Sequence, residues 1–202
     1  MPKKKKKLLF LETQMDSDIG SSRSQIGYMK ELIRNLADNN VEIITKEIHS
    51  KHDLEKFLEY ARKDKTIEFI HIVCHGYSQN NSCVIYLTKN EEVNLKHKRV
   101  LELFKNLKDK VIFFSACQIS ANAEAMTDLL LVSKCQAIFG YTRDINDSQA
   151  IMIESIFYHY IFGLKKGYYF RTIYQKILHA IDNLDIDYVE EPLADPLLVY
   201  FE

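Results

Sequence analysis

The stretch IEFIHIVCHG, residues 67–76, is a nearly unbroken run of apolar residues that ends in His75 and Gly76. A short run of this kind predicts a strand that is buried on both faces of a sheet. The stretch VIFFSAC, residues 111–117, repeats the pattern and ends in Cys117. Two buried strands that end in a histidine and a cysteine predict both the fold and the place of its chemistry.

Outward from these two stretches, short apolar runs alternate with segments whose apolar residues recur at helical spacing. This alternation predicts an α/β protein with a mainly parallel sheet of about six strands and helices on both faces. Further strands are expected at 8–12, 41–45, 83–87 (a hairpin or edge element), 135–141 and 197–201. Helices are expected at 26–36, 54–61 with Asp53 as N-cap, 100–107, 122–132, 147–162 and 171–184, and a loop at 185–196.

The composition describes an ordinary globular chain. Its 202 residues are 47% hydrophobic, enough to bury a full core in one domain, expected over residues 8–202. Its net charge of -1 provides no general attraction to nucleic acid or to a membrane, and neither is expected as a partner. Residues 1–7, which contain a run of lysines, are predicted to be disordered; a targeting signal or a polyanion contact is the alternative.

Two further features bear on the compartment. The apolar runs are too short for a membrane helix or for the core of a signal peptide. The cysteines show neither CxxC spacing nor the density of a disulfide scaffold: Cys74, Cys83, Cys117 and Cys135. We therefore expect a reduced, cytoplasmic protein.

The residue types at the two strand ends suit acyl transfer. Active sites of parallel sheets lie beyond the carboxyl ends of the strands, and neighbouring strands are about 5 Å apart. A thiol beside an imidazole can become a nucleophilic thiolate, and the imidazole can then protonate a leaving amine. Gly76 lets a backbone N–H approach the substrate oxygen, and the N–H of Cys117 is the second expected donor.

Structural alternatives exist for each residue taken alone. A single cysteine at a strand end is usually a small buried apolar residue, and a single histidine there is often a polar loop residue. Cys74 precedes His75 in a strand and should face the opposite side, in the core. A metal site would have to be formed by side chains whose spacing in the sequence is not that of a zinc site, namely His71, Cys74, His75 and Cys83. Neither a metal nor a cofactor is expected.

Two sequence blocks resemble a known family. HIVCHG (71–76) and FFSACQIS (113–120) are similar to the His-Gly and Ser-Ala-Cys motifs of CHAT domains. These are caspase-like cysteine proteases of the clan that includes caspases, separases and gingipains. GYTRDINDSQA (140–150) and the opening LLFLE with its following loop and helix also look similar, so the resemblance covers most of the chain.

The resemblance implies a caspase-like (caspase-hemoglobinase) fold and cleavage of peptide bonds in proteins without a metal. By position, His75 is the catalytic histidine, Cys117 the nucleophile, and Gly76 with Cys117 the oxyanion hole. The caspase signature QAC followed by Arg, Gln or Gly and then Gly is replaced by SACQI at 115–119, so aspartate specificity does not carry over.

The family also implies a biological setting. Prokaryotic CHAT proteases often act as effectors in defence or cell-death systems and are usually joined to a regulatory module. We therefore expect a regulated endopeptidase that acts on a protein or peptide substrate and is activated by a partner. The alternatives are a catalytically silent caspase-like interaction module and a hydrolase of another acyl substrate.

Two sets of charged residues near the predicted strand ends are alternative candidates for lining the substrate pocket. Ser115 is assigned to this pocket as well. Arg23, after the first strand, would select an acidic residue before the scissile bond. Asp144 and Asp147, after the strand that follows Cys117, would select Arg or Lys by charge pairing. Alternatively, Arg23 caps a loop and Asp147 caps the next helix, which leaves a neutral pocket.

Overall fold

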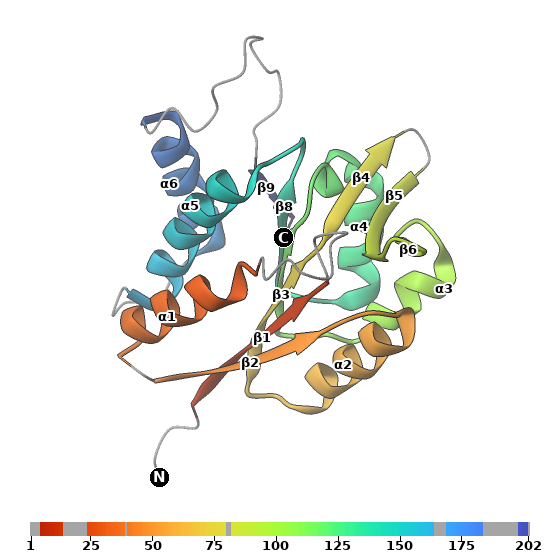
Figure 1. The fold of residues 1–202 in the computed structure, drawn as a ribbon, viewed down its shortest axis with the longest axis horizontal. Coiled ribbons are helices and arrows are strands. Elements are labelled where there is room, and N and C mark those ends of the chain that lie inside the picture. The colour runs from red at the N-terminus through yellow and green to blue at the C-terminus, as the bar shows by residue number, and fades with distance from the viewer. Residues whose placement is uncertain are drawn as a thin grey trace.

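The structure is a computed structural model of the whole chain, and it describes residues 5–13, 24–38, 40–79, 82–163, 169–183 and 198–201 (Figure 1). Arg23 and the whole of the predicted 185–196 loop lie outside these residues. Among the described residues, no helix has both the length and the apolar character needed to cross a membrane.

The described strands of the main sheet are six, in the order β2-β1-β3-β7-β8-β9. The first five are parallel to their neighbours, whereas β9 runs antiparallel to β8. The predicted mainly parallel sheet of about six strands is therefore confirmed. The bounds are Lys6–Glu12 (β1), Val41–Glu47 (β2), Ile67–Val73 (β3), Val111–Ser115 (β7), Ala137–Tyr141 (β8) and Leu198–Phe201 (β9).

Helices cover both faces of this sheet, as predicted (Figure 1). One face packs against α1 (Ile26–Leu36), α5 (Asp147–Tyr158) and α6 (Phe170–Asn183). The other face packs against α2 (Lys51–Lys63), α3 (Lys98–Leu101) and α4 (Ala123–Ser133). Short helices of other kinds follow α3, precede α4 and extend α5: η1 (Glu102–Phe104), η2 (Ile119–Ala121) and the π-helix η3 (His159–Gly163).

A second, antiparallel sheet lies beside the carboxyl end of β3. Its order is β4-β5-β6, with β4 spanning His75–Gln79, β5 Ser82–Thr88 and β6 Glu91–Asn94. The segment 83–87, expected as a hairpin or edge element, is therefore the central strand of this sheet. Only Cys74 separates β3 from β4, so His75 begins a strand whose backbone is also hydrogen-bonded to β5.

The predicted cap of α2, Asp53, is wrong, and so is the alternative role of Asp147 as the cap of α5. The N-cap of α2 is Ser50, whose side chain accepts from the Asp53 N–H, while the Asp53 carboxylate accepts from the Ser50 hydroxyl. The N-cap of α5 is Asn146, which forms a capping box with Gln149. Asp147 is the first residue of that helix and not its cap. In both cases a hydroxyl or amide side chain occupies the capping position, and the carboxylate lies within the first turn.

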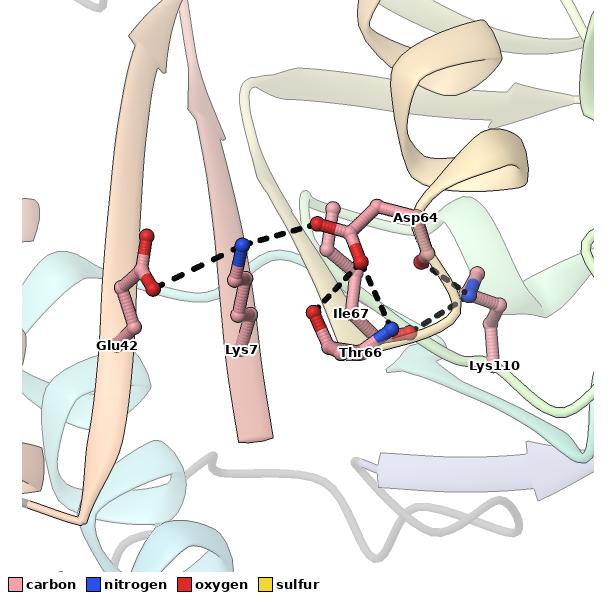
Figure 2. Close-up of polar contacts among 6 residues, drawn as sticks. All are labelled: Lys7, Glu42, Asp64, Thr66, Ile67 and Lys110. Atoms are coloured by element: carbon pink, nitrogen blue, oxygen red, sulfur yellow. Dashed lines mark hydrogen bonds and ion pairs between the residues drawn. The ribbon is translucent and has the colours of Figure 1, made fainter. Parts of the chain in front are cut away.

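A polar cluster closes the amino ends of the strands, opposite the predicted site (Figure 2). Lys7 Nζ lies 3.0 Å from Asp64 Oδ2, and Asp64 Oδ1 accepts from the hydroxyl and the N–H of Thr66. The buried Lys110 ammonium donates to the carbonyls of Ile67 and Asp64, at 2.7 and 3.1 Å. Lys7 belongs to β1, which begins at Lys6. The predicted disorder of residues 1–7 is therefore wrong for these two lysines, because the sheet and carboxylate partners hold them.

Candidate active site

The strands that carry the two predicted catalytic residues are neighbours. β3 and β7 run parallel, with Val73 opposite Ser115, and the Cys74 N–H donates to the Ser115 carbonyl at 3.1 Å. His75 and Cys117 follow this last pair on each strand. Both line one small cavity of about 70 Å³ at the carboxyl edge of the sheet. The structure therefore brings His75 and Cys117 together, as the sequence predicts.

Gly76 fits against the peptide group of Cys117. A Cβ at position 76 would lie 2.4 Å from the Cys117 carbonyl oxygen, 2.9 Å from Ala116 Cβ and 3.2 Å from the Cys117 N. Backbone atoms cannot swing aside as a flexible side chain can. Glycine is required at position 76 because no side chain has space there. This reason differs from the predicted one, which was the approach of the Gly76 N–H to the substrate oxygen. No sequence pattern indicates it.

The Cys117 thiol is half-buried and contacts the backbone of Ile145. The Ile145 N–H donates to Sγ at 3.5 Å, and Sγ lies 3.6 Å from the Ile145 carbonyl oxygen. Burial raises the pKa of this thiol, the nearby Asp144 and Asp147 raise it further, and the Ile145 N–H opposes them. In this arrangement the neutral thiol is favoured over the thiolate.

Gln118 forms a sharp turn directly after Cys117. Its φ of 56° is in the left-handed region, which is strained for a residue with a side chain. Its backbone N–H and its side chain are both hydrogen-bonded to neighbouring segments. Its N–H donates to the Arg143 carbonyl at 3.1 Å, Nε2 donates to Asp144 Oδ1 at 2.9 Å, and Oε1 accepts from the Ser78 N–H at 3.4 Å. Gln118 thus joins β4 to the segment after β8, a connection that sequence reasoning missed.

The cavity wall beside Cys117 comes from α1 and α5 as well as from the strands. Ser115 lines it and is buried, with its hydroxyl 3.4 Å from Gln25 Oε1. Gln25 is also buried, and its N–H donates to Glu12 Oε1 at 3.0 Å. Ala150 completes this side. Gln25 was not predicted; its only signal is a polar residue directly before the first apolar residue of a helix.

The predicted substrate-binding residues divide into three groups. Ser115 and the half-buried Asp147 line the cavity. Asp144 is exposed and accepts the hydrogen bond from Gln118, so the two aspartates do not occupy equivalent places. Arg23 lies outside the described residues, and the structure gives no position for it.

The alternative metal site finds no support. His71 packs on the α1 and α5 side of the sheet, whereas Cys74 and Cys83 belong to the apolar cluster on the other side. Among the residues with described positions, no group of three or more His, Cys, Asp or Glu side chains could hold a metal ion. Cys74 is buried as predicted, and burial raises the pKa of its thiol far above the usual range.

Comparison with known proteins yields evidence on the fold. No family model matches the sequence, and no curated protein matches it. The crystal structure of the Drosophila initiator caspase Dronc is similar, with a TM-score of 0.63 and 11% sequence identity. The similarity covers 98% of this chain and 80% of that chain. The chain therefore has a caspase-like fold.

Proposed function

We propose that this protein is a cysteine endopeptidase with Cys117 as nucleophile and His75 as general acid and base. The observation that carries the proposal is the placement of both side chains on one cavity, at the ends of adjacent parallel strands. The strands that precede them, β3 and β7, supply rigid support, because each is paired on both sides within the main sheet. The caspase-like fold is consistent with this chemistry.

In the proposed reaction, His75 accepts the proton of the Cys117 thiol as Sγ attacks the carbonyl carbon of a peptide bond. The carbonyl oxygen becomes an oxyanion, which the backbone N–H groups of Gly76 and Cys117 would stabilise. His75 then gives its proton to the leaving amine, and the acyl group remains on Sγ as a thioester. A water molecule, deprotonated by His75, hydrolyses the thioester and restores the thiol.

The proposed substrate preference is for Lys or Arg before the scissile bond. Asp147 is the better candidate for recognising that residue, since it lines the cavity while Asp144 is bonded to Gln118. A basic side chain would pair directly with the Asp147 carboxylate. A neutral preference remains the alternative outcome, and cleavage only after Asp would return the role to Arg23.

Activation by a partner is proposed because the cavity beside Cys117 is small. A volume of about 70 Å³ beside Cys117 has room for a few water molecules but not for a lysine or arginine side chain. Substrate binding would require the segment 142–146, which contacts the thiol through Ile145, to move outward. Strong proteolysis by the isolated chain without any partner would contradict this part of the proposal.

The finer assignment is a CHAT-domain protease, a regulated cytoplasmic effector in a prokaryotic defence or cell-death system. Its support is the pair of blocks HIVCHG (71–76) and FFSACQIS (113–120), which the fold places at the same edge of the sheet. The resemblance is the source of the proposed defence role.

A catalytically silent interaction module is the second candidate. The raised pKa of Cys117 and its contacts with Ile145 favour it, because an unreactive, shielded thiol fits a binding scaffold. The two candidates differ in turnover. A scaffold would bind peptides without cleaving them, and replacing Cys117 would leave that binding unchanged.

A library of fluorogenic peptides, varied at the residue before the scissile bond, tests the proposal. We expect the wild type, with any activating partner present, to release fluorophore, and Cys117→Ala and His75→Ala to release none while retaining the wild-type melting temperature. Peptide binding without cleavage in the wild type, under every condition tried, would establish the scaffold instead.

A further inference from the structure

A fully buried polar cluster lies in the core between the sheet and α5, apart from the cavity that His75 and Cys117 line. His71, on β3, and Glu154, on α5, are both completely buried, and Tyr141 and Tyr158 are buried beside them. Most of the side chains that pack around this cluster are aliphatic or aromatic. Isolated polar groups are costly in such surroundings unless they bond to one another.

Glu154 is the centre of the cluster. The Tyr141 hydroxyl donates to Glu154 Oε1 at 3.1 Å. His71 Nε2 lies 3.4 Å from Glu154 Oε2, close enough for an ion pair but outside hydrogen-bond geometry. The other ring nitrogen of His71, Nδ1, is 2.5 Å from the Tyr158 hydroxyl. Glu154 is thus in contact with β8 through Tyr141 and with β3 through His71.

Aromatic rings fix the position of the His71 imidazole. The ring stacks on Phe113 of β7, with centroids 5.1 Å apart, and contacts Phe10 of β1 at 4.6 Å. Burial and the Glu154 charge raise the pKa of Tyr141 well above its usual value, so its hydroxyl remains a hydrogen-bond donor at neutral pH. These contacts keep Glu154 and its partners in one arrangement.

The connection to Cys117 follows from the chain order. Tyr141 is the last residue of β8, and Glu154 is in α5, which begins after the N-cap Asn146. The hydrogen bond between them therefore joins the two elements that enclose segment 142–146. That segment supplies the Ile145 backbone that contacts Cys117 Sγ.

We propose that Tyr141 and Glu154 are positioning residues, whose buried hydrogen bond sets where segment 142–146 lies against Cys117. Neither residue is hydrogen-bonded to the Cys117 thiol in the part of the chain that the structure describes. Their role in peptide turnover rests on the function proposed above, whereas their effect on the thiol itself can be measured without any protease activity.

Loss of this hydrogen bond should change two reactions in opposite directions. If segment 142–146 loosens, Cys117 becomes less buried and Asp144 lies farther from it, and both changes lower the pKa of the thiol. They outweigh the loss of the Ile145 N–H, because burial is the largest influence on this pKa. Alkylation by a small electrophile should then become faster. Cleavage of a peptide should become slower, since Ile145 and Asp147 no longer form a fixed wall of the cavity.

Tyr141→Phe and Tyr158→Phe form a matched pair for the test. Each removes one buried hydroxyl from the same cluster, but only Tyr141 joins Glu154 to the end of β8. The probe is iodoacetamide, with the modified cysteines identified by mass spectrometry across a pH series. Cys74, Cys83 and Cys135 are buried and report any general opening of the fold.

We expect iodoacetamide to alkylate Cys117 roughly fivefold faster in Tyr141→Phe than in the wild type at neutral pH, because one hydrogen bond usually changes an equilibrium by about that factor. Its alkylation profile should shift toward lower pH. Tyr158→Phe should match the wild type, as should Glu154→Gln, because the amide oxygen can still accept from Tyr141. Where peptide turnover is measurable, Tyr141→Phe should lower it while Tyr158→Phe does not.

Equal Cys117 alkylation in the two tyrosine variants would overturn the positioning role. So would labelling of Cys74, Cys83 and Cys135 in Tyr141→Phe, because the hydroxyl would then act on the fold as a whole. A rate in Glu154→Gln as fast as in Tyr141→Phe would also overturn it, since charge and not the hydrogen bond would be responsible. If alkylation differs as expected but the wild type cleaves no peptide, the positioning role stands and the peptidase proposal fails.

Discussion

Gly76→Ala places a methyl group where the structure has the Cys117 peptide. The new Cβ would lie 2.4 Å from the Cys117 carbonyl oxygen, about 1 Å short of an ordinary carbon-to-oxygen contact. Because the obstructing atoms belong to the backbone, β4 and the residues around Cys117 must separate by a distance of that order. Gly76 has no positive φ, so the effect comes from space alone and not from backbone strain.

A displacement of about 1 Å between reacting groups can lower turnover roughly 100-fold. Overpacking of this kind costs about 1–3 kcal/mol of stability, which the sheet should tolerate. We therefore expect Gly76→Ala to fold, to melt a few degrees below the wild type, and to lose about two orders of magnitude in kcat/KM on a fluorogenic peptide.

Gly27→Ala is the matched control. Apart from its chain neighbours and the backbone of its own helix, no atom of the described residues lies within 4 Å of a Cβ built at Gly27, on α1. Alanine there should leave activity unchanged and raise stability by about 0.5–1 kcal/mol, the usual gain over glycine within a helix. If Gly76→Ala folds and cleaves the peptide at the wild-type rate, the close packing of β4 against Cys117 is refuted.

Three further predictions concern the pocket, the amino-end cluster and the buried thiols. Asp147→Ala should lower turnover of basic substrates far more than of neutral ones, and Asp144→Ala should do so less; peptide profiling of both variants checks this, and an equal effect would contradict it. Hydrogen bonds from Thr66, with help from Lys7, lower the Asp64 pKa to about 2, so its stabilisation is present above pH ~4 and lost as pH falls toward 2. Screening at this partly exposed site limits the contribution to about 1 kcal/mol, and Asp64→Asn should show a correspondingly smaller loss of melting temperature between pH 5 and pH ~2; an unchanged acid profile would contradict it. Cys74→Ala and Cys135→Ala should keep activity and lose about 1–2 kcal/mol in chemical denaturation, and an inactive but folded Cys74→Ala would contradict the choice of nucleophile.

The strands could be predicted from the sequence because both faces of the sheet are covered. Continuous apolar runs such as 67–73 and 111–115 then stand out without any knowledge of their partners. The rule that sites lie at the carboxyl ends of parallel strands was enough to predict that His75 and Cys117 lie in one site.

The rest of the site depends on contacts between segments far apart in the chain. Ser115 meets Gln25 across 90 residues, and Cys117 meets Ile145 across 28. Local periodicity contains no information on such pairs. His71 illustrates the same limit. The sequence shows it only as one residue of a buried strand, and its polar contact becomes evident only when Glu154, on a distant helix, is known to face it.

The most direct measurement of the central claim is covalent trapping by a peptide that carries an electrophile at the scissile position. Peptide mapping of the wild type, with any activating partner present, should find a single adduct on Cys117. Cys117→Ala should give none, and His75→Ala should form the adduct far more slowly while its fold is unchanged. An adduct on another cysteine, or a Cys117 adduct that forms equally fast without His75, would contradict the assignment of these two residues as a catalytic pair.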